Sequence, residues 1–386
     1  MQDNTIFIYG QTVSKNAFTD READAQKLTS NLLHGINTTI ISPRRWGKSS
    51  LVEKVLNDIS ENEKNIKTVL IDLFFVASEE EFLEKFSAAV IKASSSKVDD
   101  WVKGTKEFFK HLIPKISLGM DPVNEFSLSF DWDELRKHKD EILNLPEVIA
   151  QKKNLRFVIA LDEFQNLASF PDYSIMEKRM RAVWQRQKKV TYCLYGSKRH
   201  MMTEIFNNAS KPFYRFGDMM LLQKIDTEHW VKFIQKNFKK SGKKIAKKLA
   251  LKIPTLMRNH PWYVQQYSHY IWLKTDVEVG MSHLESALME IIYANIPFFQ
   301  KEVENISATQ LSLLKAVASG ENQLTSTRAM QNFRLGTPRN VIKNKTILIN
   351  NDIIDFDGKD YEFLDPVFEL WFLRQYLQID YLKNLR

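Results

Sequence analysis

Short apolar runs alternate with segments of helical spacing along the first part of the chain. In residues 50–59, for example, Leu51, Val55 and Ile59 fall on one face of a helix. The apolar runs are short and rich in β-branched residues, which is typical of strands buried on both faces of a parallel sheet. They predict strands at residues 38–41, 68–73, 157–161 and 190–195. The alternation predicts an α/β domain with a parallel sheet over residues 1–222.

The pattern changes after Leu222. Residues 226–304 have helical spacing without strand signals, so we expect a helical lid domain over residues 223–304. From Ser307 the pattern becomes helix, turn and helix. Strand-like runs then follow at residues 346–349, 353–356 and 361–363, with Asp357-Gly358 as a hairpin turn between the last two. This order predicts a C-terminal winged-helix domain over residues 305–386.

One stretch of the first domain, residues 94–130, is harder to interpret. Gly104, Pro114, Gly119 and Pro122 interrupt any helical spacing, while residues 126–130 alternate as an edge strand or hairpin does. We expect an insertion here, and the sequence assigns it no role.

The segment INTTIISPRRWGKSSL, residues 36–51, has the pattern of a phosphate-binding loop between a strand and a helix. In such a loop the backbone N–H groups from Arg45 to Ser49 surround the β-phosphate, and the helix directs its positive end toward it. Lys48 would reach the β- and γ-phosphates, and Ser49 would hold Mg²⁺. The alternative is an ordinary basic turn, which the strand and helix around the loop disfavour.

A second chemical signal follows the predicted strand at residues 157–161. Asp162 and Glu163 come directly after it, at the carboxyl edge of the sheet where ligands lie in open α/β folds. Asp162 would bind Mg²⁺ through water, and Glu163 would orient and deprotonate the attacking water. Because neighbouring residues of a strand alternate sides, we expect the two carboxylates to point apart. The alternative is a solvated acidic turn, which the presence of the phosphate loop disfavours.

The loop and the acidic strand end belong to a longer series of ordered motifs. The others are Phe18-Thr-Asp-Arg-Glu22, Tyr195-Gly196-Ser197, Pro212-Phe213-Tyr214-Arg215, Asn259-His260-Pro261-Trp262-Tyr263-Val264-Gln265 and Phe363-Leu-Asp365-Pro366-Val-Phe-Glu-Leu-Trp371. In this order, over nearly the whole chain, they resemble the motifs of the archaeal-type ATPases. That family, common also in bacteria, belongs to the STAND branch of the AAA+-related P-loop NTPases.

The resemblance implies a P-loop NTPase that uses ATP and Mg²⁺. It implies that Arg21 lies beside the adenine, that Ser197 senses the γ-phosphate and that Pro261 lies near the nucleotide. Arg215 would be a further cation at the phosphates, either in cis or across a subunit interface, so an oligomer is compatible with the sequence. The implied nucleotide-binding segment consists of Pro43, Arg44, Arg45, Trp46, Gly47, Lys48, Ser49 and Ser50. Ser42 and Asn259 depart from the pattern, since both stand where glycine is expected.

Charge suggests a polyanionic partner in addition to ATP. The chain has a net charge of +8, and its lysines at 239, 240, 243, 244, 247 and 248 recur as pairs that one helix would place on one face, unless Gly242 divides it. This basic lid could be a solvated face, or could contact a phosphate backbone or an acidic protein.

The winged helix leaves two alternatives open. The predicted helix at residues 337–345, opened by Thr337-Pro338, carries Arg339, Lys343 and Lys345 and could enter a DNA major groove. The hairpin at residues 351–360 holds four aspartates, which would repel phosphates and favour an intramolecular or protein-docking role.

Composition restricts the setting. The 386 residues are 44% hydrophobic with one cysteine, Cys193, so no intramolecular disulfide can form. No stretch resembles a signal peptide or a membrane span, and we expect a cytoplasmic protein. The sequence therefore predicts an ATP-hydrolysing conformational switch. The alternative is a slow or non-hydrolysing nucleotide-gated module that contacts DNA or a partner protein.

Overall fold

The structure is a computed structural model that describes residues 6–10, 21–94, 137–356 and 358–380, together with the backbone of 116–120 and 126–130. The chain divides into two compact units. The sheet unit contains Arg21–Arg44 and Lys48–Gln223, and the helical unit contains Lys224–Arg386 together with Arg45–Gly47 and the N-terminal segment. Each unit is described by itself below.

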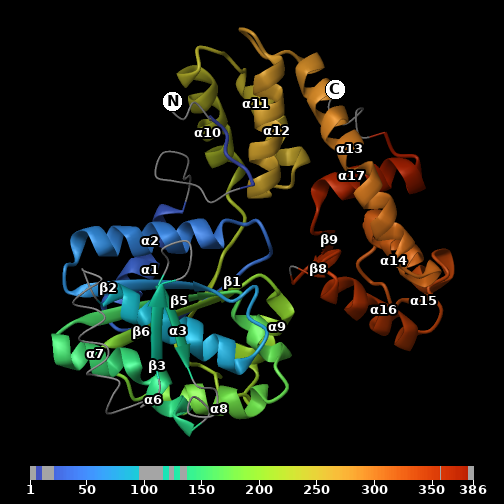
Figure 1. Ribbon diagram of the computed structural model, residues 1–386. Helices are drawn as coiled ribbons and strands as arrows, with labels where there is room; N and C mark the ends of the chain where they lie inside the picture. Colours follow the sequence, from blue (N-terminus) through green and yellow to red (C-terminus); the bar gives the residue numbers. More distant parts are fainter. Residues whose placement is uncertain are drawn as a thin grey trace. The chain divides into compact units, whose positions relative to one another are not determined.

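The sheet unit is built on five parallel strands in the order β2-β5-β6-β1-β7 (Figure 1). The four predicted strands are confirmed as β1 (Thr38–Ile41), β2 (Ile66–Asp72), β5 (Arg156–Asp162) and β6 (Val190–Gly196). The fifth strand, β7 (Asp218–Leu221), was not predicted from the sequence. Its four residues are too few to show a period, and only pairing with β1 defines them as a strand.

Helices cover both faces of this sheet (Figure 1). On one face, α1 (Glu22–Leu33) packs on α2 (Lys48–Asn62), whose Leu51, Val55 and Ile59 are buried as predicted. The other face carries α3 (Glu79–Ala93), α6 (Lys139–Leu143), α7 (Leu145–Lys153) and α8 (Tyr173–Trp184). A short 3-10 helix, η1 (Phe164–Ser169), follows β5, and α9 (Arg199–Asn207) follows β6. The carboxyl ends of β1, β5 and β6 therefore each run directly into a turn or helix.

The predicted insertion contains a β-hairpin. The strand at β4 (Phe126–Phe130) is confirmed, and it pairs antiparallel with β3 (Ile116–Met120). The remainder of residues 95–136 lies outside the described part of the chain.

The helical unit begins with the four helices of the predicted lid: α10 (Thr227–Lys240), α11 (Lys247–Leu256), α12 (Pro261–Lys274) and α13 (Met281–Glu304). Of the two alternatives left open for residues 239–248, the structure has the one in which Gly242 divides the segment, so the lysine pairs do not form one helix face. Helix α10 ends at Lys240 and Gly242 takes φ +77°, a conformation that favours glycine and terminates the helix. Lys243 then turns inward, where its ammonium donates to Trp272 O at 2.8 Å.

The winged helix consists of α14 (Ala308–Ala318), α15 (Thr327–Asn332), α16 (Pro338–Asn350), β8 (Ile354–Phe356), β9 (Tyr361–Phe363) and α17 (Pro366–Leu377). The predicted start of α16 is confirmed, with Thr337 Oγ1 accepting from Asn340 N. The predicted strand at residues 346–349 is wrong, because these residues continue α16. Val341 and Leu348, two helical turns apart, are both buried, so the apolar face of the helix overrides the strand preference of the β-branched residues. Asp357 of the predicted hairpin turn lies outside the described residues.

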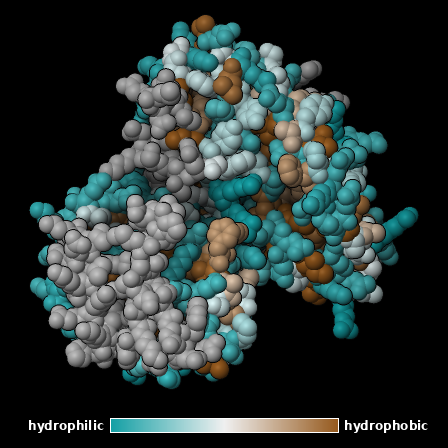
Figure 2. Space-filling view, in the orientation of Figure 1, coloured by the Kyte–Doolittle hydropathy of each residue, from teal (hydrophilic) through white to brown (hydrophobic). Residues whose placement is uncertain are grey.

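Figure 2 shows hydrophilic side chains over most of the visible face of the helical unit, with apolar side chains in smaller patches. None of the helices that the structure describes is both long and apolar enough to cross a membrane.

Candidate functional site

The predicted phosphate loop connects the end of β1 to the start of α2. Its two left-handed residues are Arg45, with φ 64°, and Gly47, with φ 88°. Ser42 has no positive φ; it is buried, and its hydroxyl donates to Pro43 O at 3.3 Å. The serine at the position of the expected glycine is therefore compatible with the backbone of this loop.

The loop meets the acidic strand end through Ser49. Its hydroxyl donates to Asp162 Oδ2 at 2.9 Å, across 113 residues of sequence. Lys48 is only 5% exposed, and its ammonium donates to Pro43 O within the loop at 3.4 Å. Ser50 is buried in the first turn of α2. The structure thus brings together the two motifs that the sequence placed at one edge of the sheet.

The two carboxylates have different side-chain partners, but strand alternation is not the reason. Strand β5 ends at Asp162, and Glu163 takes a left-handed conformation with φ 52° and ψ 42°. Asp162 Oδ1 accepts from the backbone N–H of Glu163 at 2.8 Å. The left-handed turn directs the Glu163 side chain toward the end of β6, where Ser197 donates to its Oε2 from Oγ at 2.8 Å and from N at 3.2 Å.

These environments shift the two pKa values in opposite directions. Burial raises the pKa of Asp162 to about 6, although the hydrogen bond from Ser49 and the charge of Lys48 oppose this. Burial also acts to raise the pKa of Glu163, but hydrogen bonds from Gln165 and Ser197 and the charge of Lys48 outweigh it, so the pKa is lowered. Glu163 is therefore held as a carboxylate, the form that a general base requires.

Ser197 and Arg44 belong to the same cluster. Ser197 is buried, and Arg44 Nε donates to its Oγ at 3.4 Å. Among the predicted site residues, the sheet unit therefore brings together Arg44, Lys48, Ser49, Asp162, Glu163 and Ser197.

Two other predicted residues of the sheet unit are seen with local partners. Arg215 is exposed, with φ 50°, and its guanidinium lies 5.2 Å from the centre of the Tyr214 ring. Arg21 is buried just ahead of α1, where its Nη1 lies 3.0 Å from Asp24 Oδ2. Their roles at the nucleotide stay predictions.

The middle of the loop belongs to the helical unit. The Arg45 guanidinium lies 4.6 Å from the centre of the Trp262 ring, and its Nη1 donates to Tyr263 Oη at 3.4 Å. Trp46 is 8% exposed and meets the His260 ring edge-on. The loop aromatic is thus packed within the protein.

His260 and Pro261 open helix α12. Pro261 is its first residue and His260 its N-cap. Burial, followed by the charge of Arg45, lowers the pKa of His260 to about 3, so the imidazole is neutral. Asn259 has φ 59°, a left-handed conformation that asparagine tolerates better than most residues. This explains how asparagine can replace the expected glycine.

Sequence reasoning gave Gln165 no role, although it stands two residues after Glu163. The structure shows that its side-chain amide donates to Glu163 Oε2. A polar residue two positions after the proposed base, in a turn that leaves a buried strand, was the available signal.

Comparisons with known proteins concern the fold of the whole chain. Residues 297–374 match a family model described as "Probable winged helix domain". No curated protein sequence matches the chain. The solved structure of a Walker-type ATPase of Pyrococcus abyssi is similar with a TM-score of 0.65 at 17% identity, covering 96% of this chain and 99% of that one.

The ORC2 protein of Aeropyrum pernix is also similar. Its structure with ADPNP and ADP has a TM-score of 0.60 at 13% identity, covering 100% of this chain and 98% of that one. Its ADP form has a TM-score of 0.55 at 13% identity, covering 100% and 97%.

The chain has the fold of the P-loop ATPases. The predicted parallel sheet and C-terminal winged helix are therefore confirmed. At these identities the likeness concerns the fold alone, and the placement within the STAND branch stays a prediction.

Proposed function

We propose that this protein is a Mg²⁺-dependent ATPase whose hydrolysis cycle drives a conformational change involving its nucleotide, lid and winged-helix domains. The observation that carries the proposal is the hydrogen bond between Ser49 and Asp162, with Glu163 and Lys48 beside it. A hydroxyl at the start of a helix and a carboxylate at the end of a strand form the pair that holds Mg²⁺ in P-loop NTPases.

Each residue then has a separate task. The backbone N–H groups of the loop and the Lys48 ammonium would bind the phosphates, and Ser49 and Asp162 would hold Mg²⁺. The metal ion supplies neutralisation of phosphate charge when bound. Glu163 would orient the attacking water and accept its proton, while Ser197 lies against Glu163, where a γ-phosphate sensor would act.

The test compares wild type with Glu163→Gln in steady-state ATP hydrolysis and in labelled-nucleotide binding. We expect the variant to bind MgATP with unchanged affinity and to lose at least about 100-fold in kcat, since general base catalysis contributes about 10² to 10⁴. Glu63→Gln, the same substitution on an exposed residue of the sheet unit, serves as the matched control. Chelation of Mg²⁺ by EDTA should abolish turnover. Equal turnover by Glu163→Gln and wild type would refute the assignment of the base.

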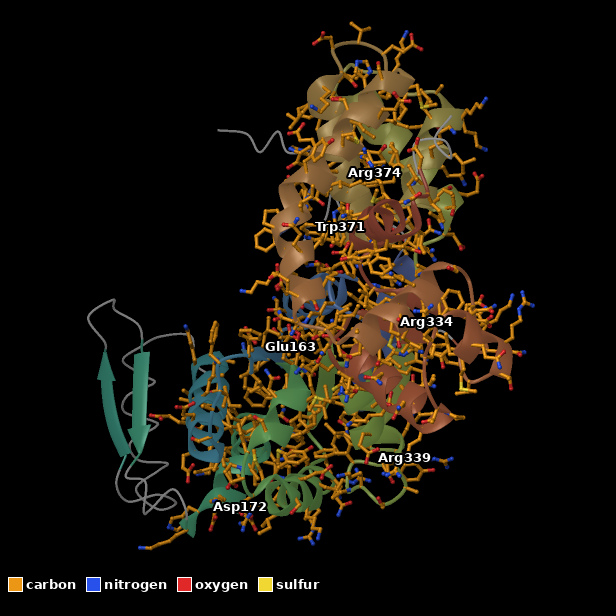
Figure 3. All side chains as sticks on the ribbon, turned by 90° about the vertical axis from the view of Figure 1, so that its right-hand side faces the viewer. Glu163, Asp172, Arg334, Arg339, Trp371 and Arg374 are labelled. Atoms are coloured by element: carbon orange, nitrogen blue, oxygen red, sulfur yellow. The ribbon has the colours of Figure 1, made fainter. Side chains whose placement is uncertain are left out.

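A second candidate function is a nucleotide-gated module that binds DNA. The observation that favours it is the charge of the segment around α15 and α16. Residues 323–351 contain five Lys or Arg and no Asp or Glu. Arg328, Arg334, Arg339 and Lys343 are exposed. Figure 3 labels Arg334, in the turn between the two helices, and Arg339, in the first turn of α16.

The exposed side of α16 has the form of a recognition helix. Arg339, Lys343 and Thr346 are exposed at helical spacing, and Ile342, 52% exposed, adds an apolar contact. The first turns of such a helix contact base edges in the major groove. Lys345 is directed elsewhere, since it donates to Tyr361 Oη at 2.9 Å. The acidic hairpin would contribute no phosphate contact, so α16 would carry the binding.

This candidate can be tested by fluorescence anisotropy with a labelled DNA duplex. Binding is measured over a series of salt concentrations, with and without ATP. We expect Arg339→Ala to weaken binding and to reduce the salt slope by about one. Lys232→Ala, at an exposed position of α10, is the control and should leave both unchanged. Equal binding by wild type and Arg339→Ala would refute a recognition role for α16.

A further inference from the structure

A buried amide lies beside the proposed catalytic base. Gln165 belongs to η1 and is only 1% exposed. Its Nε2 donates to Glu163 Oε2. A glutamine side chain is expensive to bury, so its position at this carboxylate calls for a specific role.

The same carboxylate oxygen also accepts both hydrogen bonds from Ser197. Its Oγ and N donate to Glu163 Oε2 at 2.8 and 3.2 Å. Across the described residues, the other oxygen, Oε1, accepts no hydrogen bond. Three donors thus fix the rotation of the carboxylate and leave one oxygen available to a water molecule.

The amide fits beside β6 because the last residue of that strand, Gly196, has no side chain. A Cβ atom built on Gly196 would lie 1.8 Å from Gln165 Oε1 and 2.9 Å from Met202 Sδ. Gly196 does not have a positive φ, so its backbone conformation does not require glycine. The close approach of Gln165 is therefore what excludes a side chain at this position.

The left-handed backbone of Glu163 makes the arrangement depend on these contacts. A residue other than glycine is strained in this conformation, and it persists there only where the surroundings hold it. The hydrogen bonds from Gln165 and Ser197, together with the bond from Glu163 N to Asp162, supply that restraint.

We propose that Gln165 is a positioning residue for hydrolysis, which holds Glu163 Oε2 so that Oε1 faces the attacking water. The inference rests on the proposed ATPase function and adds to it a residue that acts only through Glu163. Gly196 belongs to the same device, because it makes room for the amide.

Gln165→Met tests the role of the amide, since methionine has a similar length but no N–H donor. We expect kcat to fall about 10- to 100-fold, the size of effect that a misplaced catalytic group produces. The affinity for MgATP should stay within about two-fold, because the hydrogen bond of Gln165 is to Glu163 and not to the phosphate loop. Gln185→Met, at an exposed position of the same unit, is the matched control and should leave both quantities unchanged.

A double-mutant cycle separates positioning from a purely structural role. Glu163→Asp keeps a carboxylate but shortens it by one methylene, beyond the reach of Gln165. In that background we expect Gln165→Met to change kcat by less than about two-fold. Gly196→Ala offers an independent route, because its added methyl group displaces the amide without removing it, and it should reproduce the loss in kcat.

The outcomes are distinguishable. Unchanged kcat in both Gln165→Met and Gly196→Ala, with an active wild type, would overturn the positioning role and leave the ATPase proposal intact. Equal losses in the wild-type and Glu163→Asp backgrounds would also overturn it. A wild type that binds MgATP but never hydrolyses it would overturn both proposals.

Discussion

The N-cap of helix α17 provides a quantitative test of how the winged helix is held in place. Asp365 Oδ1 accepts from the backbone N–H groups of Val367 at 2.8 Å and Phe368 at 3.0 Å, and Oδ2 accepts from Tyr263 Oη. One side chain therefore satisfies the first turn of α17 and a hydroxyl from α12. Asp365→Ala removes all three interactions at once.

The size of the effect follows from these bonds. Loss of a capping side chain costs about 1 kcal/mol. Tyr263 is buried, so the loss of its acceptor adds about 1–3 kcal/mol, which brings the total to about 2–4 kcal/mol. Tyr263→Phe removes only the hydroxyl and should cost about 1 kcal/mol. The first turn of α17 carries buried Val367 and Phe368, so its fraying would expose apolar surface.

Hydrogen exchange measured by mass spectrometry on peptides from α17 reports the free energy of opening of this helix. Asp226→Ala is the matched control, since Asp226 also occupies an N-cap position, that of α10, but makes no capping hydrogen bond. We expect it to change the exchange of α10 by less than about 0.5 kcal/mol, since it loses only a dipole interaction. A loss below about 0.5 kcal/mol at α17 in Asp365→Ala would refute the reasoning, as would equal losses in the two variants.

Three further predictions concern the loop and the start of α12. Lys48→Ala should abolish MgATP binding in isothermal titration calorimetry, whereas Lys64→Ala, at an exposed position, should keep it. In Gly47→Ala the added Cβ would have no atom within 4 Å, so only the φ of 88° opposes the substitution. A cost of about 1–2 kcal/mol predicts that the folding equilibrium constant or the ATP affinity falls about 5- to 30-fold. No change in either quantity would contradict the loop conformation. The pKa of His260, lowered to about 3 from 6.5, means that the unfolded state binds the extra proton as the pH falls below about 6.5. The helical unit should then lose about 2 kcal/mol between pH 8 and pH 5, and denaturation at both pH values should show a smaller loss in His260→Gln, while equal losses would refute a buried neutral imidazole.

Local sequence patterns were sufficient where the tertiary environment agreed with them. Strands β1, β5 and β6 are apolar runs buried on both faces, so composition alone located them. Local sequence patterns gave wrong predictions where packing with other segments determined the structure. Residues 346–349 have β-branched side chains but continue α16, because Val341 and Leu348 share its buried face. The spacing of the lysine pairs at 239–248 is compatible with one helix, but Gly242 lies between α10 and α11.

In the candidate site, the sequence likewise predicted some features and not others. Lys48, Ser49, Asp162 and Glu163 could be named from sequence, because phosphate and Mg²⁺ binding need these residue types at a strand end and a helix start. The direction of Glu163 could not, since it depends on a left-handed turn rather than on strand alternation.

What the order of residues specified was chemistry along the chain: which segments are apolar, which turn binds phosphate and which strand ends in acids. What folding alone decided was which of these segments meet. Ser49 and Asp162 are 113 residues apart and bond only because parallel strands end at one edge of the sheet. Gln165 reaches Glu163 only because Gly196, on a different strand, has no side chain. Such contacts depend on packing between distant segments, which spacing along a single chain does not record.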